Sequence, residues 1–221
     1  LLSQCPLQLR DAFVEAFNAA MQSFPSFTGP YASGDLAAAT RLIMEWEANS
    51  QPRSYVMNLV RLQTLTLIAI AVDNQGPASL TEEHVGPAKE TILGFAVGLA
   101  YRMRLHASLG ELEVEGGIDL ESNECIAQRC WWVLVMLDRW HAISTARPLL
   151  VLNESVVLLP KLGTMVGDNV YQLARLSTIV SGFSLAAWSA PKSMTGQPVL
   201  SYMMHVSMEL FRDFIPPQCT P

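Results

Sequence analysis

The sequence predicts an all-α fold: an irregular domain of about seven helices around a buried central helix at about 122–145. Apolar residues recur at spacings of three and four through most of the 221 residues, which is the helical period. No series of short alternating segments, typical of strands, interrupts this pattern. Half of the residues are hydrophobic and only 15% are charged, against a typical share of about 25%. A chain of this length and composition can bury a large core.

The first three helices are predicted from start and stop residues. An apolar face begins after Pro6 and continues to about residue 24. The second helix is expected to start at Ser33 or Asp35, which are suitable N-caps. Ser54 is expected to cap the third helix, which reaches about residue 74 before a Gly-Pro pair stops it.

The later helices follow from the same signals. A fourth helix is predicted at about 85–108, followed by the central helix, which Pro148 terminates. The central helix is apolar nearly all round, as expected for a helix surrounded by others. Asp168 is expected to cap a sixth helix that ends near Trp188, and residues 198–214 form the seventh.

One acidic segment accounts for the net charge. Six acids and no base lie between Glu111 and Glu124, and the rest of the chain carries fourteen charges of each sign. Glycines punctuate this segment, so we expect a loop at about 110–121. It is either a solvated surface loop or a docking surface for a basic partner, such as a DNA-binding module of the same polypeptide.

Several kinds of site are not supported by the sequence. The fourteen bases are dispersed, without the basic stripe that nucleic-acid binding requires, so this chain is not expected to bind DNA by itself. No apolar run approaches the roughly 20 residues of a membrane span, and no signal peptide is evident. No catalytic motif occurs, and no catalytic or metal-ligating residues are predicted. Four cysteines lack metal-ligand spacing and are expected to be reduced thiols: Cys5, Cys125, Cys130 and Cys219.

The most informative segment is 124–160. It places charged residues and two large aromatics on a helix that is otherwise apolar, where polar groups rarely persist without defined partners. The residues that stand out are Glu124, Arg129, Trp131, Trp132, Asp138, Arg139, Arg147, Pro148, Leu159 and Pro160.

In order and spacing these residues resemble the fungal-specific transcription factor domain, the regulatory middle region of zinc-cluster transcription factors. The Trp pair, the Asp-Arg pair, the Arg-Pro pair and the final Leu-Pro all match that family's signature. Upstream, a helix ending in Leu105-His106 and the preceding Leu/Ala-rich helix around Gln63 to Ala71 also match, so the resemblance covers about 59–160. The sequence departs from the family at Gln128, where Arg is common, at Thr145-Ala146, where Leu-Gly is usual, and at Arg104, where Gly is usual.

The resemblance implies a single all-helical regulatory domain over 1–221, as a fragment of a larger nuclear protein. Zinc is then expected only in a DNA-binding module outside this chain, no cofactor is expected here, and DNA is contacted only through that module. The domain would control transcription, responding to a small-molecule effector. The alternative is a ligand-free scaffold that binds a corepressor or coactivator or self-associates, and an enzyme is a remote third. No membrane association is expected.

The signature is expected to be structural. On a helix, Asp138 and Arg139 face different directions, so Asp138 is predicted to pair with Arg147 or with an arginine of another helix. Trp131 and Trp132 project about 100° apart, so at most one can line a given cavity. An effector pocket, if these side chains line one, would draw on large aromatic and imidazole groups. The candidates are Trp46, His106, Trp140, His141, Trp188 and His205.

Overall fold

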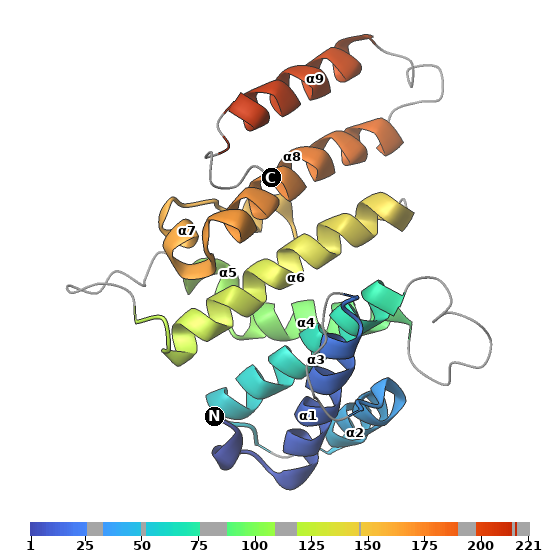
Figure 1. Cartoon of the computed structure of the whole chain (residues 1–221), viewed down its shortest axis with the longest axis vertical. Helices are drawn as coiled ribbons and strands as arrows, with labels where there is room; N and C mark the ends of the chain where they lie inside the picture. The colour runs from blue at the N-terminus through green and yellow to red at the C-terminus, as the bar shows by residue number, and fades with distance from the viewer. Residues whose placement is uncertain are drawn as a thin grey trace. The chain divides into compact units, whose positions relative to one another are not determined.

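The computed structural model describes residues 1–25, 33–49, 52–75, 88–108, 119–145, 147–189, 198–213 and 215. Within these ranges the chain forms nine α-helices and two short 3-10 helices, and the described residues contain no strand (Figure 1). The predicted all-α class is confirmed. Residues 109–118, which make up most of the predicted acidic loop, and Cys219 lie outside the described part.

The chain divides into two compact units, Leu1–Leu134 and Val135–Pro221. The boundary falls inside α6 (Asn123–Thr145), so the predicted central helix contributes to both units. Buried residues recur along α6 on either side of this boundary, from Cys125 to Ala142. The expectation that 1–221 is one domain stays a prediction.

Unit 1 is built around α3, which contacts three other α-helices and the short 3-10 helix at Leu2–Gln4 (Figure 1). Its apolar side chains at Leu59, Leu62 and Leu65 are completely buried. By length and composition α3 could cross a membrane, but 56% of that window is buried inside the structure, as in the core helix of a globular unit. The complete helices of unit 1 are η1 (Leu2–Gln4), α1 (Leu7–Gln22), α2 (Leu36–Ala48), α3 (Tyr55–Gln75), α4 (Lys89–Arg102) and α5 (Leu105–Ser108).

The N-caps predicted for the second and third helices are present, whereas Asp168, predicted to cap a later helix, is the first residue of that helix. One carboxylate oxygen of Asp35 accepts hydrogen bonds from the main-chain N–H groups of Ala37 and Ala38 at 2.9 and 3.0 Å. The Ser54 hydroxyl accepts from the N–H of Met57 at 3.2 Å. These bonds satisfy N–H groups that have no partner within the helix, which fixes where α2 and α3 begin.

The single helix predicted over 85–108 is wrong. After α4 the chain turns at Arg104, whose φ is 59°, and then forms the four-residue α5. Positive φ is unfavourable for a residue with a side chain, and glycine adopts it without this cost. The structure therefore gives a physical reason why glycine is usual here in the family that the sequence resembles.

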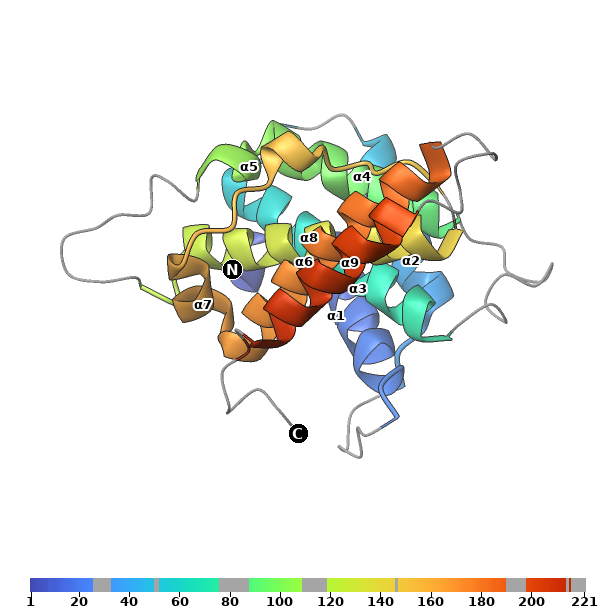
Figure 2. The same ribbon diagram turned by 90° about the horizontal axis from the view of Figure 1, so that it is seen from above.

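Unit 2 contains the C-terminal part of α6 and four further helices. Its α8 contacts both α7 and α9, and α9 lies alongside α8 (Figure 2). The short α7 was not predicted; it follows Pro160 and ends at Gly167, which has a φ of 83°. The further helices are η4 (Asn153–Ser155), α7 (Lys161–Val166), α8 (Asp168–Ser189) and α9 (Pro198–Asp213).

Candidate functional site

Asp138 fixes the segment that follows α6 in unit 2. Its side chain is 1% exposed, and both carboxylate oxygens accept hydrogen bonds from the main-chain N–H of Leu150, at 3.0 and 3.1 Å. The N–H of Val151 donates to the same carboxylate at 2.9 Å. Burial raises the pKa of Asp138, while the two N–H groups and the nearby Arg139 oppose that shift.

Arg139 extends this arrangement to two other elements of unit 2. It is also 1% exposed, and its guanidinium donates to Thr178 Oγ1 on α8 and to Asn153 Oδ1 on η4, the latter at 3.3 Å. Burial lowers the pKa of Arg139 to about 10, and Asp138 counteracts part of this effect. Arg139 is therefore charged at neutral pH, and its hydrogen bonds tie α6 to α8 and η4.

The Asp138 carboxylate is bound by main-chain donors, and its predicted pairing with Arg147 or with an arginine of another helix stays a prediction. Arg147 is exposed, as is Pro148, and the Asp138 carboxylate is occupied by main-chain donors. Since proline cannot continue the helix, the chain beyond Pro148 bends at residues 150 and 151, where two N–H groups meet the carboxylate. The contact joins residues twelve and thirteen positions apart, which helix geometry alone does not specify.

The remaining signature residues of α6 lie in unit 1. Trp131 and Trp132 are 2% and 1% exposed, and the Trp131 ring packs edge-on against Tyr101 at 5.6 Å between centroids. The indole N–H of Trp132 is buried with no hydrogen-bond acceptor among the described residues. Glu124 is exposed and Arg129 is half-buried. The two tryptophans are therefore core groups of this unit.

Gln128, which replaces a commonly found arginine, also has a structural contact. Its side chain is 1% exposed, and its amide donates to the main-chain oxygen of Leu105 at 2.7 Å. This bond holds the start of α5 against α6, immediately after the turn at Arg104. The departure from the family pattern is thus compatible with a well-packed unit.

The candidate pocket residues have different surroundings. His106 is exposed and lies 5.1 Å from the Tyr101 ring, whereas Trp46 is 7% exposed and packs under Arg53. In unit 2, Trp140 is 37% exposed and His141 is 9% exposed. His205 lies on α9 and is exposed, while the side chain of Trp188 lies outside the described residues. A pocket lined by these six residues stays a prediction.

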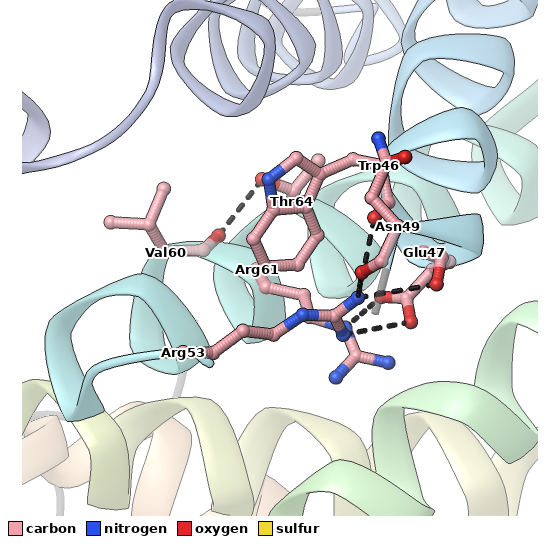
Figure 3. Close-up of polar contacts among 7 residues, drawn as sticks. All are labelled: Trp46, Glu47, Asn49, Arg53, Val60, Arg61 and Thr64. Carbon is pink, nitrogen blue, oxygen red and sulfur yellow. Dashed lines mark hydrogen bonds and ion pairs between the residues drawn. The ribbon is translucent and has the colours of Figure 1, made fainter. Parts of the chain in front are cut away.

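A second polar cluster, which the sequence analysis missed, joins α2 to α3 in unit 1 (Figure 3). We call Glu47, Arg53 and Arg61 the arginine cluster. Glu47 forms ion pairs with both arginines, at 3.1 Å to Arg53 Nη1. The Arg53 guanidinium lies 4.0 Å from the centre of the Trp46 ring, a cation–π contact.

Arg53 also terminates α2. Its Nη2 donates to the main-chain oxygens of Trp46, Glu47 and Asn49 at 3.1 to 3.2 Å (Figure 3). These carbonyls belong to the last turn of the helix, where they lack N–H partners within the helix and the dipole favours a cation. The sequence signal for this cluster was Arg61 itself, a charged residue inside the apolar run of α3.

The cysteine and metal predictions can be compared with the described part of the chain. Cys5, Cys125 and Cys130 are free thiols. No group of three His, Cys, Asp or Glu side chains in the described ranges is arranged to hold a metal ion.

Comparisons with known proteins agree with the signature on α6. Residues 23–168 match the family described as the fungal specific transcription factor domain. The chain is also 34% identical over 158 residues to an uncharacterized transcriptional regulatory protein of Schizosaccharomyces pombe. The aligned region covers 71% of this chain and 18% of that relative. No solved structure matches the chain. The family match spans well over half of the chain, from the end of α1 to the start of α8, and so this protein belongs to the fungal-specific transcription factor domain family.

Proposed function

We propose that this chain is the regulatory domain of a zinc-cluster transcription factor and that it controls transcriptional activity in response to a small-molecule effector. The family match over 23–168 is the observation that carries this proposal. Zinc and the contact with DNA would belong to a module outside this chain, and the working location would be the nucleus. The chain spans 18% of its relative from Schizosaccharomyces pombe, which leaves ample length there for other modules.

The contacts of the signature residues support a regulatory role over a catalytic one. Asp138 and Arg139 use their polar atoms to hold other parts of unit 2, and Trp131 and Trp132 fill the core of unit 1. Such residues stabilise one conformation of a domain. An effector acts on such a domain only if it binds one conformation more tightly than another, which shifts their populations. The family is a class of transcription factor regulatory domains and not a class of enzymes.

The regulatory role is tested with a reporter gene. The chain is placed between a heterologous DNA-binding domain and an activation region, and transcription is compared with that of the same fusion lacking the chain. We expect the domain to change reporter output several-fold, with Asp138→Ala weakening the change because it destabilises unit 2. Equal output from the two fusions, at equal protein level, would contradict the proposal.

The effector is tested by thermal unfolding against a panel of sugars, organic acids, amino acids and hydrophobic drug-like compounds. A ligand at 100 times its dissociation constant adds about 2.7 kcal/mol to the free energy of unfolding. In a domain of this size that raises the midpoint by roughly 5–10 °C. A cooperative transition that none of the compounds shifts would argue against an effector.

The alternative, a scaffold that binds a protein partner, is favoured by one surface of unit 2. Large apolar side chains on α9 are exposed, including Tyr202 at 68%, Met203 at 53% and Leu210 at 54%. Exposed apolar residues grouped on one helix are typical of interaction surfaces. Light scattering tests self-association. A dimer that Met203→Glu converts to a monomer supports a self-associating scaffold, and a wild-type monomer argues against self-association.

A further inference from the structure

The guanidinium of Arg61 has hydrogen-bonding capacity that the described protein does not use. The residue is 5% exposed, and its Nε is engaged in the ion pair with Glu47. Its buried Nη1 has no hydrogen-bond partner among the described residues. In Figure 3 the two terminal nitrogens point away from Glu47, and no dashed line reaches them. Leaving a buried charged donor without a partner is costly, so an acceptor at this position would be stabilising.

The charges around this group are unbalanced. Glu47 is shared between Arg53 and Arg61, and Arg53 directs its remaining donors to the carbonyls at the end of α2. Burial lowers the pKa of Arg61; Glu47 raises it, and the charges of Arg53 and Arg102 lower it further. Two positive side chains thus share one carboxylate, and a third, Arg102, lies close enough to act on Arg61. The region attracts an anion, although the chain as a whole carries a net charge of −6.

We propose that the terminal nitrogens of Arg61, together with the charge of Arg102, form a binding site for a small oxoanion, with a carboxylate or a phosphate group as the recognised element. The planar fork of an arginine matches two oxygens of such a group, and the pair of hydrogen bonds gives both affinity and orientation. The site exists independently of regulation, and only its meaning as an effector site rests on the proposed function. The Arg61 side chain keeps 6% of its surface exposed.

The test uses the full 221-residue chain, titrated with sodium succinate and with sodium phosphate in a calorimeter. Sodium chloride at matched ionic strength separates specific binding from screening. We expect saturable heat from one or both oxoanions and a rise in the unfolding midpoint that chloride does not produce. Binding of succinate alone identifies a carboxylate site, and binding of phosphate alone identifies a phosphate site.

Three variants assign the binding to this site. Arg61→Lys keeps the charge beside Glu47 but removes the fork, and should weaken binding about tenfold. Arg102→Gln changes an exposed residue and should weaken binding about two- to fivefold without affecting folding. Arg41→Gln, an exposed arginine on α2, is the matched control for loss of one positive charge and should bind normally.

Two results would overturn the proposal. One is stabilisation by succinate and phosphate no greater than that by chloride. The other is unchanged affinity in both Arg61→Lys and Arg102→Gln, which would place any bound anion elsewhere. The reporter assay remains a separate measurement, so a failure of anion binding does not count against a regulatory role, and a failure of the reporter does not count against the site.

Discussion

The carboxylate of Asp138 accepts a hydrogen bond from the main-chain N–H of Val151 at 2.9 Å, thirteen residues along the chain. Val151 is completely buried, so this N–H has no access to water as a substitute partner. The same carboxylate lies beside the buried charge of Arg139 and raises its pKa. One side chain therefore compensates two main-chain donors and a neighbouring cation.

Asp138→Ala should lower the free energy of unfolding by about 3–5 kcal/mol, because it leaves two main-chain N–H groups without an acceptor and Arg139 without its counter-charge. Asp138→Asn keeps one acceptor oxygen and should lower the free energy of unfolding by less than Asp138→Ala does. Urea unfolding of the purified chain measures both. Arg147→Ala is the comparison variant. Because Arg147 is exposed, this substitution should lower the free energy of unfolding by less than about 1 kcal/mol. A loss at Arg147 as large as that at Asp138 would identify an ion pair with Arg147 as the main interaction of Asp138.

Arg104→Gly should stabilise the protein by about 0.5–1 kcal/mol. Arg104 is exposed and has a φ of 59°, a conformation that glycine adopts without steric cost. Arg104→Ala is the matched control, since it removes the same charged side chain but keeps the Cβ atom. Chemical denaturation should show the gain for glycine only. If alanine stabilises equally, the gain comes from the loss of charge and not from the backbone.

Gly34→Ala should destabilise unit 1 by about 2–3 kcal/mol or more. A Cβ atom at Gly34 would lie 2.1 Å from the main-chain nitrogen of Ala19, so the loop before α2 would have to move off α1. Gly94→Ala is the opposite case: nothing lies within 4 Å of its Cβ position, and alanine in this helix should stabilise by about 0.5–1 kcal/mol. Midpoints of thermal unfolding that shift in the same direction for both variants would refute this explanation.

Cys130 should make the protein less stable in alkali. Its ordinary pKa is 9.0, and burial raises the pKa to about 12 in the folded chain. Between these values the unfolded state has released a proton that the folded state keeps. The free energy of unfolding therefore falls as pH rises, by up to about 1.4 kcal/mol per pH unit from this thiol.

Urea unfolding between pH 8.5 and 10.5 compares this slope in the wild type and in Cys130→Ala. The variant should lose stability at every pH because a half-buried side chain is truncated. Its slope, however, should be shallower than that of the wild type. Equal slopes would mean that the Cys130 thiol ionises as readily in the folded chain as in the unfolded one.

The sequence by itself determined the helical class, the starts of α2 and α3 and the family. The helical class and the two starts depend on apolar periodicity and on caps such as Asp35, whose partners lie two and three residues away, so this information is local. The family depends on the order and spacing of the signature residues. The break between α4 and α5 is also a local feature, but it could not be predicted from the sequence. A glycine at position 104 would have indicated a positive φ, whereas the arginine that is present does not.

The tertiary structure alone decided which polar groups meet. The partners of Asp138 depend on the path of the chain after Pro148, and the pairing of Glu47 with Arg61 depends on how α2 packs against α3. A buried charge in an apolar helix indicates that the residue needs a partner, but the sequence does not show which residue that partner is. A hydrogen bond or ion pair acts over a few ångströms in space, whatever the separation of the two residues along the chain. For the same reason, the Arg61 guanidinium became a candidate anion site only when its neighbours were known.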